Sequence, residues 1–202
     1  MAKDLKLPRG SGQTPLDDLS GLLVSIRTRE ELNDLEAKNN AKAYTKYLLL
    51  LKSSSKFNLF STASLCGIHR DMFRDVWSWA GEFRKGGATN VGVHTAQIGA
   101  EIHRLLSDAD QWEEKKMAPE EIAARIHHRL VFIHPFENGN GRWSRLVTNL
   151  YLHRKGRPLI EWPSDQKQVR EVFKPRYLAA LKKADLGEYN ALFELHKEYT
   201  KG

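Results

Sequence analysis

Residues 134–145 read His134-Pro135-Phe136-Glu137-Asn138-Gly139-Asn140-Gly141-Arg142-Trp143-Ser144-Arg145. Segments with helical apolar spacing lie directly before and after this stretch, which indicates a turn between two helices. The start of a helix exposes backbone N–H groups and the positive end of the helix dipole, and both attract anions. Arg142 and Arg145 share one face of the second helix, and His134 suits proton transfer near neutral pH. The stretch therefore predicts a phosphate-binding turn beside a proton acceptor.

Helical periodicity dominates the rest of the chain. A capping box beginning at Thr28 predicts a helix over about 28–51, and a second helix is expected to start near Ser61. Further helices are expected over 98–112, from Pro119 to the motif, over 143–155, and over 165–184 and 188–199. Residues 79–93 contain four glycines and break the pattern, which is typical of a short hairpin. The prediction is a mainly α fold, a helical bundle with a short β-hairpin.

Composition indicates an ordinary globular protein. Residues 1–27 are expected to form an N-terminal arm, and 28–202 a single domain with its core over about 60–195. Hydrophobic residues make up 41% and charged residues 28%. No apolar run approaches the ~20 residues that span a bilayer and no signal peptide is recognisable, so we expect a cytoplasmic protein without a membrane partner. The net charge of +7 favours anionic partners, and because basic and acidic residues are interleaved, nucleotide phosphates explain it as well as nucleic acid does.

The motif at 134–145 resembles the signature of the Fic family, His-Pro-Phe-x-[Asp/Glu]-Gly-Asn-Gly-Arg-x-x-Arg, at every specified position but one. Asn138 stands where the family usually carries an acidic Mg²⁺ ligand. Residues 65–84, 126–133 and 177–189 are also similar to Fic segments, so the resemblance covers about 60–195. Residues 14–17 and 33–36 resemble the Fic subgroup called mobile mystery protein B, whose members tend to be encoded beside a helix-turn-helix partner on mobile elements. That resemblance implies such a partner here.

The resemblance implies a nucleotidyltransferase that moves AMP from ATP to a hydroxyl side chain of a target protein. His134 would be the general base and Phe136 the anchor of the loop. Gly139, Asn140, Gly141, Arg142 and Arg145 would bind the nucleotide phosphates. A flap would hold the target segment in extended form, and it would comprise Arg84, Lys85, Gly86, Gly87, Ala88, Thr89, Asn90, Val91, Gly92 and Val93.

Asn138 and the question of inhibition leave alternatives open. An amide offers Mg²⁺ only a neutral oxygen, so Mg²⁺ is expected as a weakly held cofactor with Asn138 at the ligand position. The alternatives are a degenerate or restrained Fic fold that binds nucleotide without transfer, and a different, kinase-like phosphate transfer. Fic proteins are often restrained by a helix glutamate that pairs with the second motif arginine. The chain lacks the usual inhibitory motif, and we hypothesise that Glu36 pairs with Arg145 instead; a solvated helix glutamate is the alternative.

Two other site types are disfavoured by the sequence. His127, His128 and His134 suggest a metal cluster, but no acidic or thiolate partner has matching spacing. A basic nucleic-acid-binding accessory of a mobile element is a third functional hypothesis, although the sequence shows no zinc finger.

Overall fold

The computed structural model describes residues 19–54, 57–86, 92–163 and 169–200, and the mainly helical fold is confirmed. The helices of these ranges are α1 (Arg29–Ser53), α2 (Thr62–Phe73), α3 (Ile98–Glu114), α4 (Pro119–Ile133), α5 (Asn140–Arg154), α7 (Lys174–Asp185) and α8 (Asn190–Glu198), with a 3₁₀ turn η1 (Thr95–Gln97) and a π-helical turn η2 (Val169–Phe173). The hydroxyls of Thr28 and Ser61 accept backbone N–H bonds and so cap α1 and α2. Most of the expected N-terminal arm lies outside the described residues.

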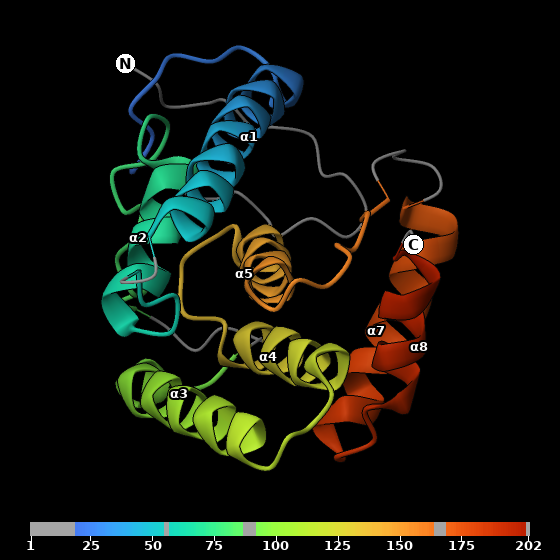
Figure 1. Cartoon of the computed structure of the whole chain (residues 1–202). Helices are drawn as coiled ribbons and strands as arrows, with labels where there is room; N and C mark the ends of the chain where they lie inside the picture. The colour runs from blue at the N-terminus through green and yellow to red at the C-terminus, as the bar shows by residue number, and fades with distance from the viewer. Residues whose placement is uncertain (1–18, 55–56, 87–91, 164–168, 201–202) are drawn as a thin grey trace.

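Helix α5 occupies the centre of the bundle. It packs against α4, α1 and α2, while α3 covers the far side of α4 (Figure 1). Helices α7 and α8 form a pair at the C-terminal end of the chain, and both contact α4. A helix in this position contributes apolar side chains to the core over most of its length. In the loop between α4 and α5, Phe136 and Gly139 are buried, whereas Glu137 is exposed.

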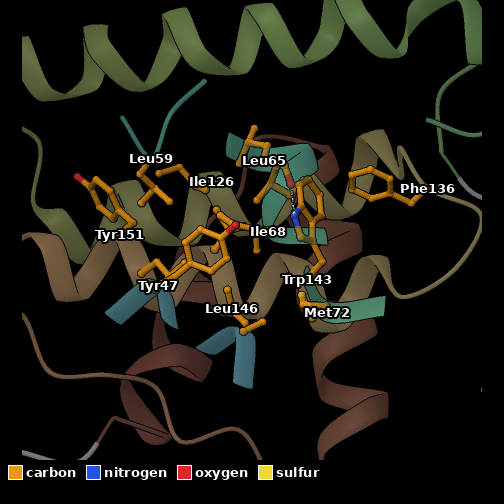
Figure 2. Packing of buried hydrophobic residues seen from close by; sticks show 14 of the residues in the cluster. Tyr47, Leu59, Leu65, Ile68, Met72, Ile126, Phe136, Trp143, Leu146 and Tyr151 are labelled. Carbon is orange, nitrogen blue, oxygen red and sulfur yellow. Dashed lines mark hydrogen bonds between the residues drawn. The ribbon is translucent and has the colours of Figure 1, made fainter. Parts of the chain in front are cut away.

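The core is built largely from α2, α4 and α5. Figure 2 shows Trp143 among buried side chains of α2, with its indole N–H donating to the carbonyl oxygen of Leu65 at 3.0 Å. The apolar stripe predicted for α5 is buried throughout, at Trp143, Leu146, Val147, Leu150 and Tyr151. Burying one large apolar side chain stabilises the fold by about 1.5–3 kcal/mol, so this stripe fixes α5 firmly.

Helix α4 ends and α5 begins where the sequence predicts a turn. Helix α4 stops at Ile133, and His134 caps it in the left-handed region with φ 50°. Pro135 has no backbone N–H to continue the helix. Helix α5 starts at Asn140 after Gly139, whose φ is 77°. A Cβ on Gly139 would lie 2.4 Å from the Phe73 ring, so this position has no room for any other residue.

The hairpin expected between 79 and 93 is only partly described. Residues 84–86 and 92–93 form no strand, and residues 87–91 lie outside the described ranges. The β-structure of the described residues is limited to two isolated bridges, Leu22 with Trp77 and Ile160 with Thr200. None of the helices in the described ranges combines the length and the apolar character needed to cross a bilayer.

Candidate active site

The loop that joins α4 to α5 is held by buried groups. The side-chain oxygen of Asn140 accepts the Phe136 backbone N–H at 3.0 Å, and its amide nitrogen donates to the Phe136 carbonyl at 2.7 Å. Phe136 is fully buried. Its ring stacks on His69 with centroids 3.6 Å apart and meets Trp143 edge-on at 4.9 Å. Asn140 and Phe136 therefore fix the shape of the loop from inside, before any ligand is bound.

His69 is a site residue that sequence reasoning missed. The Gly81 backbone N–H donates to Nδ1 of His69 at 3.0 Å, so the ring proton of the neutral form sits on Nε2. That nitrogen donates to the Asn138 carbonyl at 3.0 Å. Burial lowers the pKa of His69 to about 3, which keeps the ring neutral. The available signal was a polar ring beside Ile68 and Met72 in the buried stripe of α2.

The first turn of α5 presents an anion site. The N–H groups of Asn140, Gly141 and Arg142 precede the first bond of the helix, which runs from Trp143 N–H to Gly139 O at 2.9 Å. No capping side chain and no acidic residue occupies this turn. The Gly139 N–H, by contrast, donates to the Asn138 side-chain oxygen at 2.7 Å. Three N–H groups of the turn are therefore positioned to bind phosphate oxygens.

The two motif arginines have different neighbours. Nη1 of Arg142 lies 2.5 Å from Oε2 of Glu36, whose other oxygen accepts the Trp77 indole N–H at 2.7 Å. The hypothesis that Glu36 pairs with Arg145 is wrong, because the carboxylate of α1 lies over the first arginine. Nε of Arg145 donates to the Gly141 carbonyl at 2.9 Å, and its guanidinium lies 5.8 Å from the Trp162 ring centre. Arg145 has no carboxylate partner in the described residues, which leaves its charge available to an anion.

His134 is a neutral base at physiological pH. Burial lowers its pKa below the ordinary value for histidine, and the positive charge of Arg84 lowers it further. Its Nδ1 atom is buried without a hydrogen-bond partner among the described residues. Because Nδ1 is buried, Nε2 is the ring nitrogen that a reacting hydroxyl would have to reach.

The expected flap residues do not all face solvent. Arg84 is 3% exposed and binds the loop, whereas Lys85 is exposed and pairs with Glu82 at 2.8 Å. Gly86 and Gly92 are also exposed. Gly87, Ala88, Thr89, Asn90 and Val91 lie outside the described residues. Val93 is half-buried against the end of α4, where its N–H donates to the Ile133 carbonyl at 3.4 Å.

The residues around the loop do not make a fitting Mg²⁺ site. Both oxygens of Asn138 already accept hydrogen bonds, the carbonyl from His69 and the side chain from Gly139. No group of three or more His, Cys, Asp or Glu side chains is placed to hold a metal ion within the described ranges. His127 is engaged with His196 at 3.0 Å and Tyr177 at 2.9 Å, which accounts for it without zinc. The donor set is that of an anion site.

Comparison with known proteins relates part of the chain to a known family. Residues 59–152 match the family model described as Fic/DOC family. The chain is 31% identical over 157 residues to the protein adenylyltransferase Fic of Aedes aegypti, covering 75% of this chain and 30% of that protein. It is 29% identical to the protein adenylyltransferase fic-1 of Caenorhabditis briggsae, covering 88% of this chain and 34% of that protein. The chain thus spans about a third of the length of these curated relatives.

Solved structures share the fold. A Fic domain containing signaling protein from Bacteroides thetaiotaomicron superposes with a TM-score of 0.67 at 22% identity, covering 82% of this chain and 69% of that one. The BepC protein of Bartonella tribocorum, solved with bound AMPPNP, superposes with a TM-score of 0.66 at 19% identity, covering 97% of this chain and 96% of that one. The family match, the helical fold and the turn between α4 and α5 lead to one conclusion: residues 59–152 of this chain form a domain of the Fic/DOC family.

Proposed function

We propose that this chain transfers AMP from ATP to a hydroxyl group of a Ser, Thr or Tyr side chain on another protein. The observation that carries the proposal is the juxtaposition of a neutral, proton-accepting His134 with the uncapped start of α5 and its two arginines. The relatives named protein adenylyltransferase support the same reaction at 29–35% identity.

The proposed step uses groups of the loop and of the first turns of α5. Nε2 of His134 takes the proton of the target hydroxyl as the oxygen attacks the α-phosphorus of ATP. The bond from the α-phosphorus to the bridging oxygen breaks, and pyrophosphate leaves. The free N–H groups of Asn140, Gly141 and Arg142 would stabilise the phosphate charge, and one such donor is worth about 2.7–4 kcal/mol in comparable sites. Arg142 and Arg145 would orient the leaving pyrophosphate.

A restrained state of the same enzyme is supported by one specific contact. Glu36 on α1 pairs with Arg142, and the Glu36 side chain is 3% exposed. An arginine held in this way offers less charge to a phosphate. We infer that the described conformation has reduced nucleotide affinity, and that displacement of Glu36 restores it.

A labelling experiment tests the proposal. The purified chain and a cell lysate are incubated with ATP labelled at the α- or the γ-phosphate, using the native sequence, His134→Ala and His103→Ala. His103 is exposed on α3 and serves as the matched control. Label reaching protein from α-labelled ATP, lost only in His134→Ala, is the expected result. Label from γ-labelled ATP alone would mean a kinase, and the same result in both histidine variants would refute the role of His134.

A further inference from the structure

Arg84 connects the loop that carries His134 to the segment that begins at residue 84. Its backbone N–H donates to the Pro135 carbonyl at 2.9 Å, and its Nε donates to the His134 carbonyl at 2.7 Å. Its Nη2 donates to the carbonyl of Val93. One buried side chain thus ties residues 84 and 93, the two ends of the expected flap, to the loop that carries His134.

The backbone of His134 needs this support. A non-glycine residue with φ 50° lies in the left-handed region, which costs free energy unless the surroundings hold it there. Gly92 lies directly against it: a Cβ on Gly92 would be 2.6 Å from Cβ of His134 and 3.0 Å from Nη2 of Arg84. With φ 99°, Gly92 is also in a conformation that other residues rarely adopt. The three residues form one close-packed unit.

We propose that Arg84 is a positioning residue for His134, and that with Gly92 it fixes the base and both ends of the 84–93 segment as a single unit. This inference rests on the proposed role of His134 as the base. Arg84 acts through His134 and the loop carbonyls, and it makes no contact with the arginines of α5 in the described residues.

The proposal differs from a purely structural role because Arg84 carries a charge. Among the described residues, Arg84 is the charged side chain that acts on His134, and its guanidinium favours the neutral ring. Arg84→Gln removes the charge and keeps one side-chain donor. Arg84→Lys keeps the charge and loses the planar fork that reaches two carbonyls at once. Gly92→Ala leaves every charge in place and displaces His134.

The test combines a measurement that needs no activity with one that does. NMR titration of the His134 ring follows its pKa in the native chain, in the three variants and in Arg154→Gln, an exposed control on α5. Arg84→Gln is expected to raise the pKa of His134, because the positive charge beside the ring is lost, while Arg84→Lys and Arg154→Gln leave it unchanged. In the transfer assay, kcat is expected to fall about 100-fold in Arg84→Lys and Gly92→Ala with the KM for ATP little changed, because a base displaced by about 1 Å loses rate of that order.

The outcomes separate the two proposals. An unchanged His134 pKa in Arg84→Gln would overturn the positioning role, as would native kcat in Arg84→Lys and Gly92→Ala. If the native chain transfers nothing, the proposed function fails while the NMR titration still decides whether Arg84 acts on His134. Circular dichroism and thermal midpoints identify a variant that fails to fold, and the remaining two variants then carry the test.

Discussion

Replacing Glu36 by glutamine is expected to tighten ATP binding while it weakens the fold. Glutamine keeps an oxygen that can accept the Trp77 indole N–H, now 2.7 Å from Oε1. It removes the negative charge that lies 2.5 Å from Nη1 of Arg142. Arg142 would then carry an uncompensated charge toward the start of α5. The two effects have opposite signs, and this combination distinguishes an inhibitory contact from an ordinary structural ion pair.

The size of each effect follows from burial. A hydrogen bond to a charged group contributes about 1.5–3 kcal/mol, which corresponds to about 10- to 150-fold in affinity if ATP no longer has to displace it. The Arg142 side chain is 34% exposed, so solvent screens part of the interaction and we expect the lower end, about tenfold. Loss of the pair should destabilise the fold by about 1–3 kcal/mol, or several degrees in Tm for a chain of this size.

Calorimetric titration with ATP and a thermal melt measure both quantities on the same samples. Glu30→Gln is the matched control, because Glu30 is exposed on the first turn of α1. The reasoning is refuted if Glu36→Gln binds ATP with native or weaker affinity while its melting temperature falls. That result would make Glu36 a structural partner of Arg142 and nothing more. A change of the same size in Glu30→Gln would mean that net charge, and not the contact, controls affinity.

Three further results are expected. His69→Phe should lower the free energy of unfolding, measured in urea titrations, by about 2–5 kcal/mol, because it leaves the Gly81 N–H and the Asn138 carbonyl without partners. The control His103→Phe should leave the free energy of unfolding unchanged. Unfolded histidine has a pKa of about 6.5 whereas burial lowers the pKa of folded His69 and His196 to about 3, so the unfolded state binds more protons between these values. The free energy of unfolding should therefore be highest above about pH 6.5 and should fall as the pH drops toward 3, by up to about 1.4 kcal/mol per pH unit for each histidine. A free energy of unfolding that stays constant between pH 7 and 4.5 would contradict this. Asn138→Asp should make nucleotide affinity more dependent on Mg²⁺ in titrations with and without the ion, because a carboxylate supplies the charge that the amide lacks. An unchanged dependence would show that a carboxylate at position 138 does not create a Mg²⁺ ligand.

Local features of this fold could be predicted from the sequence. The helices around the site follow from apolar spacing, and the limits of α4 follow from Pro119 and Pro135. Helix α5 begins at Asn140, three residues before the expected start at 143. These signals act within a few residues of one another, so a single sequence carries them. The features that predict phosphate binding at the turn are local for the same reason, because the uncapped helix start and its arginines are contiguous in the chain.

Contacts between distant segments were not predictable in the same way. The sequence identified Glu36 as a candidate inhibitory residue. Which arginine its carboxylate reaches is decided by how α1 packs on α5, and this packing depends on the core around Trp77 and Trp143. The bond between His69 and Asn138 joins residues 69 positions apart, and no local pattern specifies it. Arg84 was expected to face a target, but it is buried beneath the loop. It donates there to the carbonyl of His134, which lies just past the end of α4.

The ion pair between Glu36 and Arg142 spans 106 positions of the chain. A ribosome adds about 5–20 residues per second, so α1 waits roughly 5–20 s after its own synthesis before its arginine partner has been made. During that interval the carboxylate of Glu36 has no partner on α5, and the turn that would bind nucleotide does not yet exist. The contact between Glu36 and Arg142 therefore cannot form until the first turn of α5 has been made. Because α1 is made first, the carboxylate of Glu36 is already present when Arg142 is added to the chain.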